Sequence, residues 1–445
     1  MNQSFFVKTY GCQMNEYDSE KIDDLLIREG YRKAKNFEVS DVAILNTCHI
    51  RKKASEKFYS DLGRLSLFKI NREKIGKKLR IVVMGCVAQA EGEEVLKRNK
   101  LVDYVVGPQN IQSIPKLLED KNDQVVHTDF LSEEKFKSFP DSRFKDVSRF
   151  LTVQEGCDKF CTFCVVPYTR GSEYSRPVES IYAEANNLVN TGALELTLLG
   201  QNVSAYHSNI LKNMTKKKVS LANLCKILSS LEKLKRIRYL TSHPSDITDE
   251  LIEEHKTNKK LMPFLHLPIQ SGSNTILKRM NRKHTRDFYM KLVSRIKNKV
   301  PNMAFSSDFI VGYPGETNED FEQTLDLIDR VGFASSYSFK YSPRPGTPAS
   351  LNDEIIKESL SSLRLKKIQS KLLDQQNDFN SKFIDKEVDV LITKKSKKLD
   401  QYVGRTPYLQ PVHVFSSKNL IGRILKIKIE RLTSFSFHGK ILDSL

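Results

Sequence analysis

The run VQEGCDKFCTFCVVPYTRG (residues 153–171) places Cys157, Cys161 and Cys164 in one short segment. Three residues separate the first two cysteines, and two separate the last two. A zinc site normally has four ligands, and no fourth Cys or His lies close by in the sequence. Three thiolates can instead hold three corners of a four-iron cluster and leave the fourth iron for a chelating small molecule. The spacing predicts such a cluster, with zinc or a purely structural cluster as the alternative.

Apolar segments alternate with helical patterns around this run. The expected strands are residues 150–156, 195–201, 237–242, 263–270, 305–312 and 336–342. This alternation predicts an α/β fold with parallel strands and helices outside them. Six such units indicate an incomplete (β/α)6 barrel, whose active face should lie at the C-terminal ends of the strands.

The first 120 residues show the same alternation and predict an N-terminal parallel α/β sheet domain. Cys12, Cys48 and Cys86 each fall at the C-terminal end of an expected strand or two residues beyond it. Because right-handed crossovers return every strand in the same direction, these thiols should gather at one edge of the sheet. We therefore expect a second site of three cysteines. The alternative is three small residues buried in the core.

The C-terminal part of the chain changes character after a helix expected at residues 353–378. Residues 385–445 alternate apolar and polar positions with glycines at the turns, which predicts a small antiparallel β-barrel or sandwich. This segment has twelve Lys and Arg against six Asp and Glu, a charge that suits nucleic acid. The expected domains are residues 1–120, a linker at 121–142, a core at 143–375 and a β-barrel at 376–445.

The whole chain of 445 residues carries a net charge of +18, from 72 Lys and Arg against 54 Asp and Glu. Such an excess favours a polyanionic partner, although a generally Lys-rich composition is the alternative. No apolar stretch is long enough to cross a membrane. The seven cysteines are too few for a disulfide-stapled secreted fold, and the N-terminus lacks a secretory pattern. We expect a cytoplasmic protein with no membrane contact.

The cysteine loop resembles that of the radical S-adenosylmethionine (SAM) enzymes, and the whole chain resembles their methylthiotransferase family. The matching stretches include KTYGCQMNEYDS, ILNTCHIRKKASEK, GCVAQAEGEE, VVGPQN, LLGQNV, HLPIQSGSN, DFIVGYPGET and YSPRPGTPA. The resemblance implies a radical SAM barrel followed by a barrel similar to a TRAM domain. It also implies a [4Fe–4S] cluster on Cys157, Cys161 and Cys164 that chelates SAM.

By the same resemblance, Cys12, Cys48 and Cys86 hold a second [4Fe–4S] cluster that supplies or carries sulfur. Both open irons must serve one substrate, so the edge of the N-terminal sheet should cap the mouth of the barrel.

Within the family, the chain is most similar to the branch that acts on tRNA. That branch methylthiolates C2 of N6-(dimethylallyl)adenosine at position 37, next to the anticodon. The alternatives are threonylcarbamoyladenosine in tRNA or an aspartate of a ribosomal protein as substrate, and a non-enzymatic redox sensor that binds nucleic acid. The implied partners are tRNA, a reducing electron-donor protein and a sulfur source, and we expect a monomer.

Several polar residues and glycines near the ends of the expected strands are candidate cofactor-binding residues. They are Gln201, Asn202, Gln270, Asp308, Gly312 and Glu316, with Arg170 after the cysteine loop. Gly312 would let the backbone approach the cofactor closely, and Asp308 and Glu316 could bond ribose or the methionine amine. Arg170 could pair with the cofactor carboxylate or an RNA phosphate. The alternatives are turn-forming roles and, for Arg170, ion pairs with neighbouring carboxylates. Cys225, within a leucine-rich helical pattern, is expected in the core.

Overall fold

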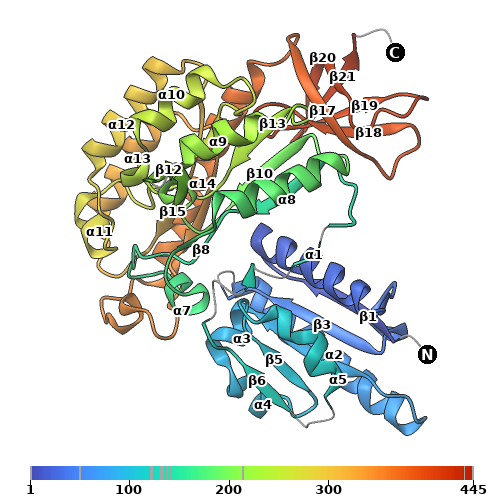
Figure 1. Cartoon of the computed structure of the whole chain (residues 1–445). Coiled ribbons are helices and arrows are strands. Elements are labelled where there is room, and N and C mark those ends of the chain that lie inside the picture. The colour runs from blue at the N-terminus through green and yellow to red at the C-terminus, as the bar shows by residue number, and fades with distance from the viewer. Residues whose placement is uncertain are drawn as a thin grey trace.

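The N-terminal sheet has six parallel strands in the order β2-β1-β3-β4-β5-β6 (Figure 1). The computed structural model describes residues 3–49, 52–120, 124–130, 135–136, 139–140, 142–212, 215–434 and 436–442. The strands are β1 (Ser4–Thr9), β2 (Arg32–Lys33), β3 (Val42–Thr47), β4 (Arg80–Gly85), β5 (Tyr104–Val106) and β6 (Val125–His127). The helices are α1 (Gln13–Arg28), α2 (Lys52–Lys74), α3 (Cys86–Glu91), α4 (Glu93–Arg98) and α5 (Ile114–Glu119).

Both faces of this sheet are covered, which explains the continuous apolar runs of β3 and β4. Alternate residues such as Leu45 and Val83 pack beneath α2, α3 and α4. Their neighbours, such as Ile44 and Val82, pack beneath α1 and α5. The expected parallel sheet domain is confirmed.

Strand β6 lies inside the segment expected to be a linker, residues 121–142. Its residues Val125–His127 pair in parallel with β5 and extend the sheet. Polar residues surround this strand, so its sequence shows no clear period. Part of the segment expected to be a linker therefore belongs to the N-terminal domain.

Six parallel strands with helices outside them form the central part of the chain. The strands are β7 (Ser148–Thr152), β10 (Glu195–Leu199), β13 (Arg236–Tyr239), β14 (Phe264–His266), β15 (Ala304–Val311) and β16 (Ser335–Lys340). They form two sheets, β13-β10-β7 and β14-β15-β16, which a parallel bridge between Ile237 and Leu261 connects. This arrangement is the expected incomplete barrel.

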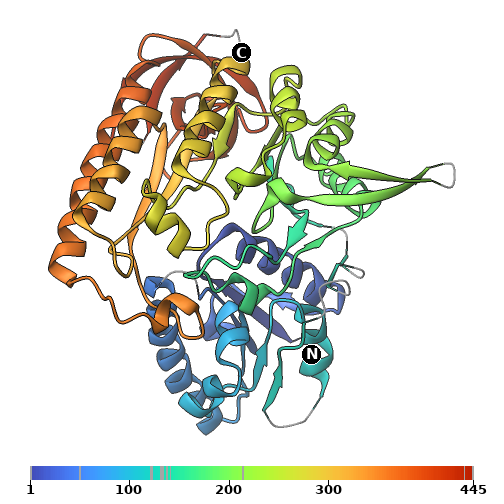
Figure 2. The ribbon, with the colours of Figure 1, turned by 90° about the vertical axis from the view of Figure 1, so that its left-hand side faces the viewer.

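The helices that cover the barrel share its large apolar core. They are α8 (Val178–Asn190), α9 (Leu221–Ser229), α10 (Asp249–Thr257), α11 (Asn274–Arg279), α12 (Arg286–Lys299), α13 (Asn318–Val331) and α14 (Glu358–Ser381). Helix α7 (Val166–Arg170) and the short strands β8 (Gln154–Glu155) and β9 (Tyr174–Ser175) flank the cysteine loop. A hairpin of β11 (His207–Lys212) and β12 (Thr215–Ser220) projects from the barrel (Figure 2).

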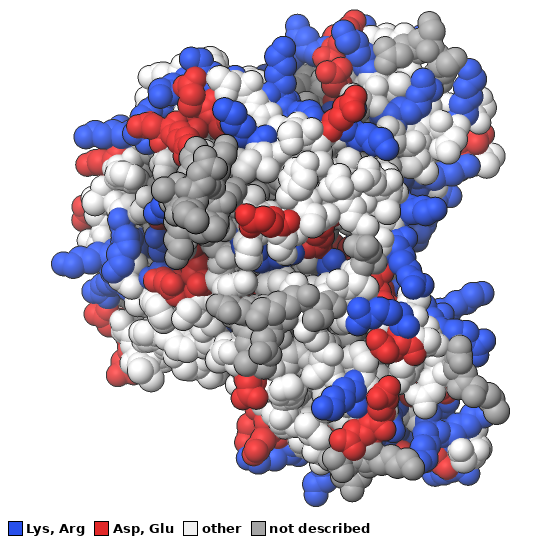
Figure 3. All heavy atoms as spheres, in the orientation of Figure 1, with Lys and Arg blue, Asp and Glu red and all other residues white. Residues whose placement is uncertain are grey.

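The C-terminal strands close into a five-stranded barrel in the order β17-β18-β19-β21-β20. They are β17 (Glu387–Lys395), β18 (Gln401–Arg405), β19 (Pro411–Phe415), β20 (Ile424–Leu432) and β21 (Phe437–Ile441). The pairing is antiparallel as expected, except that β19 and β21 run parallel. Many Lys and Arg side chains lie on the surface of this barrel (Figure 3).

Partly buried ion pairs connect helix α1 of the N-terminal domain to the central barrel. Glu20 bonds Arg149 at 2.8 Å, and Lys21 bonds Glu184 of α8 at 2.7 Å. At the other end, Arg236 and Arg238 of β13 donate hydrogen bonds to backbone carbonyls of the C-terminal barrel. No described helix has the length and apolarity needed to cross a bilayer.

Candidate active site

Cys12, Cys48 and Cys86 lie at the C-terminal ends of β1, β3 and β4, on one edge of the N-terminal sheet. Cys12 is the N-cap of α1, and Cys86 is the first residue of α3. A Cβ on Gly11 would lie 2.6 Å from the sulfur of Cys48, so that thiol packs against the turn that carries Cys12. The structure therefore brings the three dispersed cysteines together.

The charges around this N-terminal triad favour a thiolate at Cys12. A hydrogen bond from Cys48 lowers the pKa of Cys12 to about 6 against the opposing effect of burial, and the Arg170 cation lowers it further. Burial raises the pKa of Cys86, while Arg170 acts in the opposite direction. A cysteine binds metal as the thiolate, so the low pKa of Cys12 suits that role.

The second triad, Cys157, Cys161 and Cys164, lies in the loop between β8 and α7. The backbone N–H of Cys157 donates to the carbonyl of Gly171 at 3.2 Å, and that of Thr162 donates to Met280 at 3.1 Å. These bonds hold the loop over the barrel from two sides.

Burial and, to a smaller extent, the neighbouring Cys161 thiol raise the pKa of Cys157 to about 11 and that of Cys164 to about 12. The three thiols are therefore close neighbours. Arg282 donates a hydrogen bond to the sulfur of Cys161 at 3.5 Å. A bound cationic metal centre would stabilise the thiolate form that burial disfavours.

Each triad offers three thiol donors, the ligand type of iron–sulfur clusters. Within the described residues, no three His, Cys, Asp or Glu side chains enclose one metal ion. A cubic cluster does not need that geometry, because each thiolate binds a different iron atom. Two all-thiol triads therefore fit two such groups.

Gln201 and Asn202, which follow β10, lie beside the cysteine loop. The Oε1 of Gln201 accepts a hydrogen bond from the N–H of Gly156 at 2.6 Å. Asn202 donates to Asp246 at 2.7 Å, and Asp246 also bonds Lys159 of the loop at 2.8 Å. Both residues therefore brace the loop.

Gln270 and Asp308 lie together in the second half of the barrel. The backbone N–H of Gln270, which has a φ of 81°, donates to the carbonyl of Asp308. The Asp308 carboxylate lies 3.4 Å from Nε2 of His266 and is 29% exposed. His266 is therefore partner-bonded, and the carboxylate remains accessible.

Gly312 and Glu316 form one turn after β15. Gly312 has a φ of 68°, and a Cβ there would lie 2.3 Å from the hydroxyl of Ser361. The buried carboxylate of Glu316 accepts from the N–H of Gly312 and from Arg364, each at 2.7 Å. The contacts of Glu316 are those of a turn-fixing residue.

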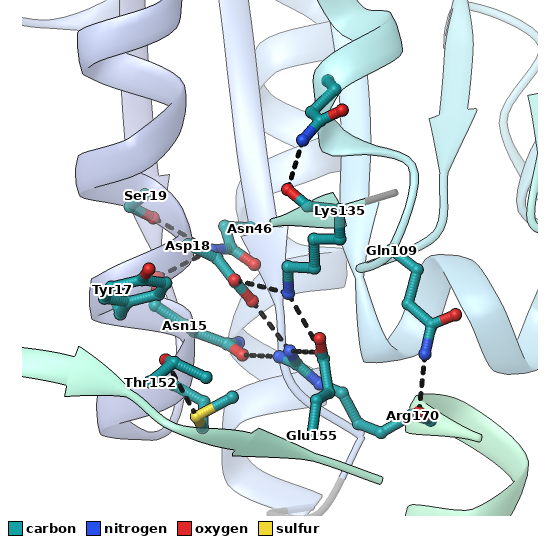
Figure 4. A network of polar contacts seen from close by, with 12 residues as sticks. Asn15, Tyr17, Asp18, Ser19, Asn46, Gln109, Lys135, Thr152, Glu155 and Arg170 are labelled. Atoms are coloured by element: carbon teal, nitrogen blue, oxygen red, sulfur yellow. Dashed lines mark hydrogen bonds and ion pairs between the residues drawn. The ribbon is translucent and has the colours of Figure 1, made fainter. Parts of the chain in front are cut away.

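The side chain of Arg170 lies at the N-terminal triad, although Arg170 follows the cysteine loop in the sequence. Its guanidinium bonds Asp18, Glu155 and Asn15 (Figure 4). Lys135 bonds the same two carboxylates at 2.8 and 2.9 Å. These contacts correspond to the alternative in which Arg170 forms ion pairs with carboxylates.

Sequence reasoning missed Asn15, Asp18, Lys135 and Arg282. The spacing of Cys12, Asn15 and Asp18 puts them on one face of α1, a signal that could have found two of them. Lys135 gives no such signal, because a lysine in a polar segment normally remains in water.

Some buried polar atoms that lack a hydrogen-bond partner belong to residues beyond the ends of the barrel strands. Among the described residues, buried atoms of Ser242, His243, His284 and Tyr341 have no hydrogen-bond partner. The rings of His243 and His284 lie 5.2 Å apart. Burial lowers the pKa of His243 to about 2 and that of His284 to about 3, so both are neutral. Such groups are expected where a polar ligand binds.

The two triads lie on elements that face each other. Helix α7, which begins two residues after Cys164, packs against α3, which begins at Cys86. Arg344, in the loop after β16, lies within electrostatic reach of Cys48. The edge of the N-terminal sheet thus lies against loops of the barrel.

Three family models match successive parts of the chain. Residues 4–107 match the uncharacterized protein family UPF0004, residues 151–328 the Radical SAM superfamily, and residues 382–442 the TRAM domain.

Curated proteins are similar over the full length. The tRNA-2-methylthio-N(6)-dimethylallyladenosine synthase of Rickettsia felis is 50% identical, over 99% of this chain and 100% of that protein. The synthase of the same name from Rickettsia prowazekii is 49% identical with the same coverage. The chain belongs to the tRNA-2-methylthio-N(6)-dimethylallyladenosine synthase family. The expected methylthiotransferase resemblance is confirmed, and the chain is a radical SAM enzyme with SAM and a [4Fe–4S] cluster as cofactors.

Solved structures share the fold at low identity. The radical SAM methyltransferase TsrM from Kitasatospora setae has a TM-score of 0.57 at 12% identity, over 79% of this chain and 74% of that one. The cobalamin-dependent radical enzyme OxsB has a TM-score of 0.52 at 14% identity, over 83% and 56%. They support the fold alone.

Proposed function

We propose that the chain methylthiolates C2 of N6-(dimethylallyl)adenosine at position 37 of tRNA, next to the anticodon. The observation that carries this function is the 50% identity, from end to end, to synthases named for that product. The two cysteine triads supply the metal-binding groups that radical and sulfur chemistry need.

Each triad has a separate role in this proposal. Cys157, Cys161 and Cys164 hold the [4Fe–4S] cluster that binds SAM, and Cys12, Cys48 and Cys86 hold a second [4Fe–4S] cluster. When bound, the first supplies the electron that cleaves SAM and the second supplies or carries sulfur. The domains of the chain orient the two groups toward one substrate and limit the access of water.

The candidate cofactor residues act in two ways. Gln201 and Asn202 position the cysteine loop, and the turn of Gly312 and Glu316 shapes the strand end beside it. Asp308 keeps an accessible carboxylate that can bond ribose or the methionine amine of SAM.

The remaining partners follow from the chemistry and the charge. The basic C-terminal barrel grips the tRNA backbone. A reducing protein delivers electrons and a separate donor replenishes sulfur. The enzyme works as a monomer in the cytoplasm.

The test is to express the chain in a bacterium that lacks its own synthase and to digest its tRNA. Mass spectrometry should then detect the 2-methylthio derivative of N6-(dimethylallyl)adenosine. Alanine variants of either triad should leave the precursor nucleoside unchanged. If wild type also leaves only the precursor, the proposed substrate is wrong.

Iron counting tests the two clusters separately. Anaerobically reconstituted wild type should hold about eight irons, and each triad changed to alanine about four. An unchanged iron content in the Cys12, Cys48 and Cys86 variant would refute the second cluster.

A further inference from the structure

Arg170 links two parts of the molecule that the chemistry must hold together. It is the last residue of α7 and follows Cys164 by six positions. Its side chain is nevertheless 3% exposed and extends into the N-terminal domain, where it bonds residues of α1.

Three oxygen acceptors fix the guanidinium. Its Nη1 donates to Asp18 at 2.9 Å and to Glu155 at 2.5 Å, and its Nη2 donates to Asn15 at 2.9 Å (Figure 4). Asp18 and Asn15 come from α1, whereas Glu155 comes from β8 beside the cysteine loop. One side chain therefore connects the segments of the chain that carry the two triads.

The same contacts bring the cation to the thiols of the N-terminal triad. Asn15, which accepts from Arg170, also lies 3.7 Å from the sulfur of Cys12 and donates to the carbonyl of Thr47, next to Cys48. Helix α7 packs on α3, whose first residue is Cys86.

The charges of the network show what Arg170 can contribute. Arg170 and Lys135 balance the two carboxylates of Asp18 and Glu155, and all four side chains are almost fully buried. Of these two cations, Arg170 is the one that bonds Asn15, whose Oδ1 lies 3.7 Å from the sulfur of Cys12, whereas the ammonium of Lys135 bonds only the carboxylates in the part of the chain that the structure describes. In a dry site, a fixed cation acts strongly on a neighbouring anionic group.

We propose that Arg170 is a positioning residue for the N-terminal cysteine site. It sets the separation of the two triads and places a buried positive charge beside whatever Cys12, Cys48 and Cys86 hold. This inference rests on the second cluster of the proposed function. A cluster gains negative charge on reduction, so a nearby cation should favour the reduced form and raise its potential.

The experiment isolates the N-terminal cluster in the full chain by changing Cys157, Cys161 and Cys164 to alanine. In this background, Arg170→Met and Arg170→Lys are compared by iron content and by a redox titration followed by electron paramagnetic resonance. The Met variant should retain iron but show a more negative midpoint potential. The Lys variant keeps the charge but loses the planar fork, so its shift should be smaller and its spectrum altered.

Arg176→Met is the matched control. Arg176 is equally buried, also bonds across the domain boundary to Tyr17, and contacts Glu184 instead of any cysteine. Its loss should disturb the interface but leave the potential of the cluster unchanged.

The outcomes separate this inference from the proposed function. Absence of iron in the background variant refutes the second cluster itself. Iron with an unshifted potential in Arg170→Met, or an equal shift in Arg176→Met, overturns the role of Arg170 alone. If Arg170→Met does not fold, a wild-type spectrum and potential in Arg170→Lys overturns it.

Discussion

Glu184 is a single carboxylate that cations from two domains share. Lys21 of α1 lies 2.7 Å from it and Arg176 lies 2.8 Å from it. Although burial opposes ionisation, these cations lower the pKa of Glu184 to about 2. Because its folded pKa is below the ordinary 4.5, the ionised form stabilises the fold at neutral pH.

We predict that Glu184→Gln lowers the free energy of unfolding by about 3 kcal/mol at pH 7. The difference from wild type should persist above pH 4.5 and vanish as pH falls from 4.5 toward 2. Urea unfolding of the cluster-free chain measures it. Glu20→Gln is the control. Because burial raises the pKa of Glu20, the stability difference between this variant and wild type should not vanish between pH 4.5 and 2 in the same way. A difference independent of pH would contradict the prediction.

Cys225 tests which thiols serve the metal sites. It lies on the inner face of α9 and is fully buried in the apolar core of the barrel. We predict that Cys225→Ala keeps the wild-type iron content and costs about 1 kcal/mol of stability, because it removes a small buried group. Iron analysis and thermal melting check both parts, and a loss of iron would assign Cys225 to a cluster.

At the level of residues, the sequence predicted that Cys12, Cys48 and Cys86 meet at one edge of the sheet, because parallel strands with right-handed crossovers all end on that side. It could not predict the partners of Arg170, because Asp18 and Asn15 reach its guanidinium from helix α1, a distant part of the chain. A cation that follows a cofactor loop suggests the cofactor as its partner. The packing of α7 on α3 instead directs the Arg170 side chain into the N-terminal domain.

The loop that carries the second triad depends on a glycine. Gly156 has a φ of 79°, and a Cβ there would lie 1.9 Å from the carbonyl oxygen of Ser172. This backbone contact leaves no room for a side chain, so a substitution must displace the loop.

We predict that Gly156→Ala loses the iron of one cluster, about four atoms, and forms no 5′-deoxyadenosine from SAM. Gly192→Ala is the matched control, because Gly192 also has a positive φ but nothing lies within 4 Å of its Cβ position. Gly192→Ala should keep both clusters, with the free energy of unfolding lower by roughly 1 kcal/mol. Equal iron loss in both variants would mean that strain, and not the contact with Ser172, is the cause.

The long apolar strands could be predicted from the sequence, and the short strands could not. The buried strands β3 and β4 read clearly as apolar runs. Strand β6 has three half-buried residues and depends on its neighbour β5 for pairing. Its existence is a property of the sheet more than of its own sequence.

For the whole molecule, the C-terminal barrel is held by two buried arginines. Arg236 donates to the carbonyls of Arg405 and Asp389 at 2.8 and 2.9 Å, and Arg238 donates to those of Thr406 and Pro407. Arg238 also pairs with Glu195 at 2.8 Å. These bonds fix the C-terminal barrel relative to the core.

We predict that Arg236→Met weakens this attachment, because it loses two charge-assisted hydrogen bonds of roughly 1.5–3 kcal/mol each. Trypsin should release the barrel faster, while the iron content stays at the wild-type value. Arg431→Met, an exposed position on β20, is the control. Proteolysis at the wild-type rate in Arg236→Met would show that other contacts hold the barrel.

The carbonyl groups that Arg236 and Arg238 grasp are present whatever side chains the barrel carries. These hydrogen bonds therefore constrain the path of the barrel's main chain, whereas the side chains on the surface of the barrel can change freely. A foreign five-stranded barrel with the same loop path could be transplanted onto this core, so the surface of this domain could change during evolution without rebuilding the catalytic half.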